Sequence, residues 1–97
     1  MDRYKEFEKR LVKLKRIANE VKTSSRLAGI FMEKYKSNID ELLRLTRKRM
    51  IPDSQGAGCG LFKGLSDYGE LESNKALFQA ALEADRYYSN ECKTFKD

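Results

Sequence analysis

The chain has 97 residues, of which 36% are charged and 10% aromatic, with a net charge of +5 and no histidine. The length limits the chain to one small domain, and the composition is typical of solvated helices rather than of a mixed fold. No run of about 18 apolar residues is present, which excludes a membrane-spanning helix, and the first residues lack the apolar stretch of a signal peptide. We therefore expect one helical domain over residues 1–97, located in the cytoplasm, where isolated cysteines stay reduced.

An apolar heptad pattern runs from residue 4 to residue 46. Its members are spaced alternately three and four residues apart, which places them along one face of a helix. The pattern predicts a helix over about residues 3–50, ending before Pro52, because a residue that precedes proline is biased away from helical geometry. At 1.5 Å per residue the patterned part alone would be roughly 65 Å long, too long for the rest of the chain to cover. The pattern therefore predicts assembly with partner helices.

The centre of this long helix is its weakest part. Residues 23–25 (Thr-Ser-Ser) and Gly29 have low helix propensity and predict a kink, or a close approach of a neighbouring backbone. A helix that restarts at Asn19 or Ser37 is the alternative, with the long helix broken in two.

Residues 51–60 interrupt the pattern, with glycine at positions 56, 58 and 60, and predict a loop. A second helix is predicted over about residues 61–96, because the three-four spacing of apolar residues resumes at Leu71 and continues to Phe95. The apolar pattern at Phe95 leaves open that the sequence is a piece of a longer helical domain. The predicted fold is all-α: a long heptad-bearing helix, a Gly-rich turn and a second helix, forming a helical hairpin that assembles into a coiled-coil bundle.

Large side chains of the two heptad stripes form the predicted oligomer interface. They are Leu11, Leu14, Val21, Met32, Tyr35, Ile39, Leu42, Phe78, Ala81 and Tyr88. The expected partner is a second copy, in a homodimer, or another helical protein. Truncation of a large, fully buried member to alanine is expected to cost about 2–5 kcal/mol.

Positive charge is concentrated in the first half of the chain. Residues 1–51 have a net charge of +8 and residues 52–97 a net charge of −3. The basic half is expected to meet phosphate in nucleic acid or in lipid headgroups, or to be neutralised by the acidic half of its own hairpin. The candidate anion-binding residues are Arg10, Lys13, Arg16, Arg44, Arg47, Lys48 and Arg49. The alternative for all of them is a solvated helix face, and residues 44–49 also complement a helix C-terminal dipole.

The sequence offers little catalytic chemistry. Histidine, the commonest general base and metal ligand, is absent. Two cysteines cannot complete a four-ligand zinc site, and an activated Cys59 would need Lys63 as its basic partner. The glycines around Cys59 lack the Gly-Lys-Ser/Thr sequence of a phosphate loop. We therefore expect no catalytic residue, no cofactor and no bound metal. A disulfide between Cys59 and Cys92 stays open.

A long first helix followed by the stretch LFKGLSDYGELE, at residues 61–72, resembles the first two helices of BAR domains, especially the sorting-nexin and arfaptin-like group. The resemblance covers most of the chain and implies an antiparallel helical dimer that binds curved anionic membranes through basic patches. A BAR protomer is a longer coiled coil of three helices, and its third helix has no counterpart here.

The predicted function is a non-enzymatic helical module for protein interaction, oligomerisation or scaffolding. The first alternative is a module bound peripherally to anionic membranes, as the BAR resemblance implies. The second alternative is a small nucleic-acid-associated regulator or a phage-type inhibitor protein, since short charged helical chains of this kind carry no motif. Binding to anionic liposomes, to duplex DNA or to neither distinguishes the three.

Overall fold

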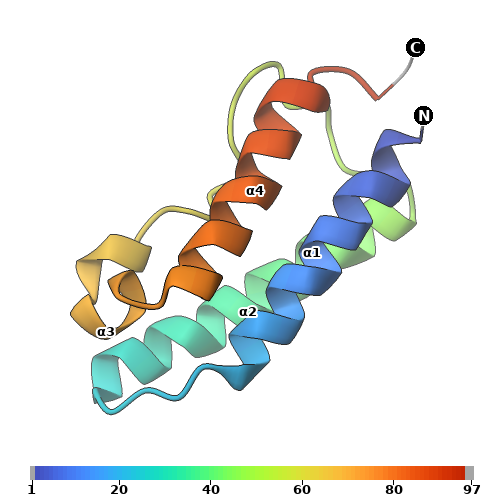
Figure 1. Cartoon of the computed structure of the whole chain (residues 1–97). Coiled ribbons are helices and arrows are strands. Elements are labelled where there is room, and N and C mark those ends of the chain that lie inside the picture. Colours follow the sequence, from blue (N-terminus) through green and yellow to red (C-terminus); the bar gives the residue numbers. More distant parts are fainter. Residues whose placement is uncertain (1, 96–97) are drawn as a thin grey trace.

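The computed structural model describes residues 2–95, which form helices joined by irregular segments and contain no strand. The helices are α1 (Arg3–Glu20), α2 (Arg26–Arg47), α3 (Gly69–Glu72) and α4 (Lys75–Glu91), with a 3₁₀ helix over Leu65–Asp67 just before α3 (Figure 1). The described part of the chain measures 44 × 21 × 17 Å. The predicted all-α class is confirmed.

The long helix predicted over residues 3–50 is wrong as a continuous element. α1 ends at Glu20, and Val21 after it has extended geometry, with φ −71° and ψ 128°. α2 begins after Ser25, whose hydroxyl accepts a hydrogen bond from the backbone N–H of Ala28 at 3.3 Å. The break falls at the Thr-Ser-Ser stretch, because serine satisfies the free N–H groups of a helix start better than it continues a helix. The alternative restarts at Asn19 and Ser37 are also wrong.

The break lets α2 fold back along α1, so that the two helices run antiparallel. Two ion pairs fix this direction: Arg47 of α2 lies 2.7 Å from Glu8 of α1, and Lys15 of α1 lies 2.6 Å from Asp40 of α2. The two helices of the first half thus cover part of each other's apolar stripe.

α4 packs on another side of α1, also antiparallel to it (Figure 1). The ring of Phe7 stacks on that of Tyr88 at 5.2 Å between centroids, and Tyr4 stacks on Phe95 at 4.2 Å. Since both α2 and α4 oppose α1, they are parallel to each other. The chain must therefore travel back along the molecule between the end of α2 and the start of α4, which explains the long irregular connection.

Side-chain and backbone hydrogen bonds hold this connection in place. The Tyr88 hydroxyl donates to the carbonyl of Pro52 at 2.6 Å, and the Tyr35 hydroxyl donates to the carbonyl of Leu61. Asp85 of α4 accepts from the backbone N–H groups of Cys59 at 2.9 Å and Leu61 at 3.3 Å. The connection is thus held against the core at several points, although most of residues 52–60 are exposed.

The second helix predicted over residues 61–96 is wrong at both ends. Residues 61–74 form the 3₁₀ helix, α3 and turns, and α4 begins after Asn74, whose side chain accepts from the N–H of Leu77 at 3.1 Å. α4 ends at Glu91, and residue 96 lies outside the described residues. Gly64 turns the chain before α3 with a φ of +86°, where a Cβ would lie 2.8 Å from the ring of Phe31.

All ten residues of the predicted oligomer interface lie in or against the core of the single chain. Seven are buried, with 6% exposure or less, namely Leu11, Leu14, Met32, Tyr35, Ile39, Ala81 and Tyr88. Val21, Leu42 and Phe78 are partly buried and pack against that core. These seven side chains are buried within the single chain, and their role in an oligomer interface stays a prediction.

Candidate functional site

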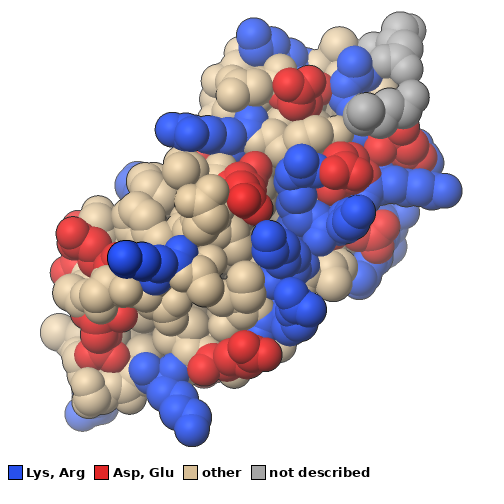
Figure 2. All heavy atoms as spheres, viewed as in Figure 1, with Lys and Arg blue, Asp and Glu red and all other residues tan. Residues whose placement is uncertain are grey.

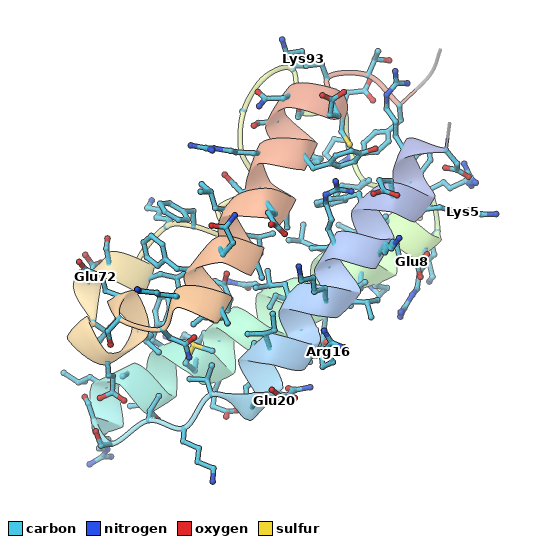
Figure 3. All side chains as sticks on the ribbon, viewed as in Figure 1. Lys5, Glu8, Arg16, Glu20, Glu72 and Lys93 are labelled. Atoms are coloured by element: carbon cyan, nitrogen blue, oxygen red, sulfur yellow. The ribbon has the colours of Figure 1, made fainter. Side chains whose placement is uncertain are left out.

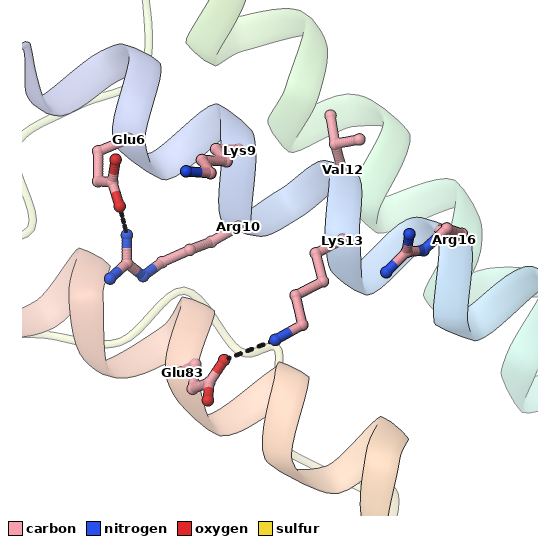
Figure 4. A pocket seen from close by; sticks show the side chains of 7 residues that line it. All are labelled: Glu6, Lys9, Arg10, Val12, Lys13, Arg16 and Glu83. Carbon is pink, nitrogen blue, oxygen red and sulfur yellow. Dashed lines mark hydrogen bonds and ion pairs between the residues drawn. The ribbon is translucent and has the colours of Figure 1, made fainter.

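A groove of about 410 Å³ lies where the outer face of α1 meets α4 (Figure 4). A second hollow of about 290 Å³ shares Arg10 and Glu83 with it and continues along α4. We call the combined surface the α1–α4 groove, and its residues are Glu6, Lys9, Arg10, Val12, Lys13, Arg16, Glu83, Arg86, Tyr87, Asn90 and Glu91.

Local sequence determines which side chains of α1 reach this groove. Asp2 caps α1 by accepting from the N–H of Tyr4 at 3.0 Å, and the apolar stripe that begins at Phe7 faces the core. The cations at positions 9, 13 and 16 then share the outer side of the helix, since residues three or four apart are neighbours on a helix surface. Figure 2 shows Lys and Arg side chains gathered along α1, and Figure 3 places Arg16 near its end.

Two cations of the groove already have carboxylate partners. Arg10 pairs with Glu6 and stacks its guanidinium over the ring of Tyr87 at 4.3 Å, while Lys13 lies 3.4 Å from Glu83. Hydrogen bonds from Gln79 and Lys13 lower the pKa of Glu83, which keeps that carboxylate charged. The Lys13–Glu83 pair and the contact of Arg10 with the Tyr87 ring join α1 to α4 at the surface.

The other cations of the groove are uncompensated. Lys9, Arg16 and Arg86 are exposed and form no ion pair with any residue of the range 2–95. Val12 lies between Lys9 and Arg16 along α1 and is 46% exposed. The groove thus combines free positive charge with an exposed apolar side chain.

The predicted anion-binding residues separate into two places. Arg10, Lys13 and Arg16 line the groove, whereas the other four lie at the far end of α2. Of these, Arg44 pairs with Glu41, Arg47 with Glu8 and Arg49 with Asp2. Lys48 alone of the four has no ion pair within the described chain.

These ion pairs show where the positive charge of the first half is neutralised. The carboxylates that pair with Arg10, Arg44, Arg47 and Arg49 all belong to residues 1–51. Among residues 2–95, only the Lys13–Glu83 pair connects a candidate cation to the acidic half. The expected neutralisation by the second half is therefore wrong for most of these residues.

Tyr87 lies at the α4 wall of the groove and is only 9% exposed. Its hydroxyl is fully buried and has no hydrogen-bond partner among residues 2–95. Burial raises the pKa of this hydroxyl, with a smaller contribution from nearby Cys92. Nothing in the sequence pattern singles out Tyr87 or Arg86, because their proximity to the cations of α1 arises only when α4 packs on α1.

A third hollow, of about 300 Å³, lies beside Cys59 and Tyr35. The Cys59 thiol donates to Asp85 at 3.4 Å, and burial, reinforced by the negative charge of Asp85, raises the pKa of the thiol strongly. A protonated thiol is a poor nucleophile and a poor metal ligand. Both cysteines are free, so the disulfide left open between Cys59 and Cys92 is not formed.

Within the described chain, no group of three or more Cys, Asp or Glu side chains is placed to hold a metal ion. Across the same residues, none of the helices combines the length and the apolar character needed to cross a membrane. Comparisons of the chain with protein-family models, with curated proteins and with solved structures find no match. The resemblance to BAR domains stays a prediction, although the long first helix that contributed to it is divided into α1 and α2.

Proposed function

We propose that this chain is a non-enzymatic helical interaction module that binds an acidic segment of a partner protein through the α1–α4 groove. One observation carries the proposal: the uncompensated cations Lys9 and Arg16 line the same hollow as the exposed side chain of Val12, and Arg86 lines the adjoining hollow. Protein interfaces combine apolar contact at the centre with polar and charged groups around it.

The carboxylates of the groove favour a protein over a phosphate-bearing partner. Glu6, Glu83 and Glu91 lie among the five cations, which leaves a net charge of +2 for the groove. Surfaces that bind nucleic acid obtain most of their affinity from cations on phosphates, and carboxylates at the same place repel those phosphates. A protein partner offers both signs of charge and apolar groups, and so complements a mixed surface.

The non-enzymatic part of the proposal is supported by the state of Cys59. This partly buried thiol lies beside the third hollow, and its raised pKa keeps it protonated. We place the interaction surface on the outer face of α1 instead of on the heptad stripe. A cytoplasmic location belongs to the same proposal, since both cysteines are free thiols.

Charge reversal in the groove tests the proposal. The double variant Lys9→Glu/Arg16→Glu removes two uncompensated cations, and Lys34→Glu/Lys63→Glu is the matched control, because these lysines are equally exposed and lie outside the groove. We expect poly-L-glutamate to bind the native protein and the control alike, and to bind the groove variant about tenfold more weakly. Equal thermal unfolding of the variants, followed by circular dichroism, shows that the substitutions leave the fold intact.

Two results would contradict the proposal. Equal affinity of poly-L-glutamate for both double variants would show that the groove is not the binding surface. Tighter binding of phosphatidylserine vesicles or duplex DNA than of poly-L-glutamate, lost in the groove variant, would assign the groove to membranes or nucleic acid instead. Vesicle binding would favour the BAR-like alternative, and DNA binding with a steep salt dependence would favour the nucleic-acid regulator.

A further inference from the structure

We infer that the occupant of the α1–α4 groove is an α-helix of a different protein, with three carboxylates and one apolar residue on a single face. This inference rests on the proposed function and adds the shape and the residue pattern of the partner.

The spacing of the cations on α1 carries the inference. Lys9, Lys13 and Arg16 all line the groove, at positions i, i+4 and i+7 of one helix. At 1.5 Å per residue, their Cα atoms are separated along the helix axis by about 6 Å and then about 4.5 Å. A second helix lying parallel to α1 and running in the same direction has the same rise, so its own side chains at i, i+4 and i+7 meet these cations in register.

An extended peptide matches the cations less well. Its same-side residues advance by about 6.6 Å at each step, so the third of them lies about 13 Å from the first. The corresponding distance from Lys9 to Arg16 along α1 is about 10.5 Å. A helix therefore satisfies the whole row of cations, whereas a strand in register with Lys9 and Lys13 overshoots Arg16.

The apolar contact has a defined place in this arrangement. Val12 lies at i+3 relative to Lys9, between the first and second cations, and nearly half of its surface is exposed. A leucine or alanine at the matching position of the incoming helix would cover Val12. An amphipathic helix laid into a groove between two helices is a common recognition mode, anchored at i, i+3, i+4 and i+7.

Binding need not break the ion pairs that exist. Lys9 and Arg16 accept a new carboxylate without losing a partner from the described chain. Lys13 holds Glu83 in a pair whose side chains are 51% and 42% exposed. Exchange or sharing of such an exposed pair costs little, because water screens it.

A second copy of the chain complements the groove poorly. On α2, Glu33 is already paired with Lys36, and Glu41 with Arg44. These acidic residues of α2 therefore share their surface with cations. On α4, Glu83 and Glu91 line the groove itself. None of the helices in the described part of the chain carries three carboxylates at i, i+4 and i+7 on an exposed face. The occupant is therefore a helix of another protein.

Two alanine-rich helical peptides of identical composition test the inference. The first has Glu at i, i+4 and i+7 and Leu at i+3, and the second has the same residues distributed around the helix. We expect the first peptide to bind about tenfold more tightly than the second, because only the first places every carboxylate on the groove. The preference should be lost in Lys9→Glu/Arg16→Glu and kept in Lys34→Glu/Lys63→Glu, measured by titration of labelled peptides.

Each of the other experimental outcomes leads to a different conclusion. If the two peptides bind equally, or if neither binds while poly-L-glutamate does, the helical partner is excluded and the proposed function stands. If poly-L-glutamate also fails to bind, both the inference and the proposed function are overturned. A dimer in sedimentation equilibrium that dissociates in the Lys9→Glu/Arg16→Glu variant would identify a second copy as the occupant and would overturn the inference.

Discussion

Three buried tyrosines differ in the partners of their hydroxyl groups. Tyr35 and Tyr88 donate to backbone carbonyls of the connection between α2 and α4, whereas the Tyr87 hydroxyl is buried without a partner in the described chain. A buried polar group without a hydrogen bond loses its water contacts and gains nothing in exchange. The three residues thus allow a comparison of buried tyrosine hydroxyls with and without a hydrogen bond.

Removal of the Tyr88 hydroxyl and removal of the Tyr87 hydroxyl, each by a Tyr→Phe substitution, should change the free energy of unfolding in opposite directions. Tyr88→Phe loses its bond to Pro52 and should lower the free energy of unfolding by about 1–2 kcal/mol. Tyr87→Phe removes only an unpaired hydroxyl and should raise the free energy of unfolding by up to about 1 kcal/mol. Urea unfolding followed by circular dichroism measures both. A loss of stability in Tyr87→Phe as large as that in Tyr88→Phe would show that the Tyr87 hydroxyl is hydrogen-bonded in solution.

At the scale of the elements, a side chain of α3 stabilises the N-terminal end of α2. Glu70, in the first turn of α3, accepts from the N–H of Ser24 at 2.8 Å, from the N–H of Ser25 at 3.1 Å and from the Ser24 hydroxyl at 3.2 Å. A negative charge just before a helix N-terminus also interacts favourably with the helix dipole. A carboxylate 46 residues away in the sequence therefore fixes the break between α1 and α2.

Glu70→Ala should lower the free energy of unfolding by about 1–2 kcal/mol, because three hydrogen bonds to the start of α2 are lost. Glu72→Ala is the matched control, since Glu72 lies on the same short helix (Figure 3), is exposed and accepts no hydrogen bond from the described chain. Chemical denaturation gives the free energies, and amide hydrogen exchange at residues 26–30 locates the effect. Equal stability of the two variants would mean that Glu70 does not hold α2 in solution.

Helix faces and the start of α1 at residue 3 could be predicted from this sequence, but the end of α1 and both ends of α4 could not. The heptad spacing correctly assigns Leu11, Leu14 and Ile39 to a buried stripe. The same spacing continues without interruption through residues 21–25, so it does not detect the break there; only the low helix propensity of that stretch indicates it. Periodicity also shows which face is apolar but not whether that face meets the same chain or another one.

The groove could be predicted only in part for a similar reason. The cluster of cations on α1 is visible in the sequence, and it includes Arg10, Lys13 and Arg16, which line the groove. Arg86 and Tyr87 are more than 70 positions further along the chain than Arg10. Their place at the groove depends on the packing of α4 against α1, for which no local signal exists.

At the scale of the whole molecule, the burial of cysteine thiols and tyrosine hydroxyls makes the free energy of unfolding depend on pH in the alkaline range. Burial raises the pKa of Cys92 from the ordinary 9.0 of a thiol to about 11, and it also raises the pKa of Cys59 and of Tyr35, Tyr87 and Tyr88. The unfolded chain releases these protons at a lower pH than the folded chain does. Stability is therefore fully present below about pH 9 and falls as pH rises above it.

The free energy of unfolding should be constant from neutral pH to about pH 9 and then decrease by about 1.4 kcal/mol per pH unit for each buried thiol. Urea unfolding in the presence of a reducing agent, from neutral pH to about pH 11, measures this slope. In Cys92→Ala the slope should be smaller, since one titrating group is removed. A native protein as stable at pH 11 as at neutral pH would contradict the assignment of the thiols to the core.

The antiparallel packing of α4 on α1 has a consequence for how the chain folds. Ring contacts join Phe7 to Tyr88 and Tyr4 to Phe95, so residues near the two ends of the sequence complete one core. Helical proteins usually fold fast because their contacts are short-range along the chain. Here the pairing of α1 with α4 must first close a loop that includes nearly the whole sequence, with the entropy loss that a long loop entails. α1 can pair with α2 through a short connection, but the part of the core between α1 and α4 forms only after the chain has closed this long loop.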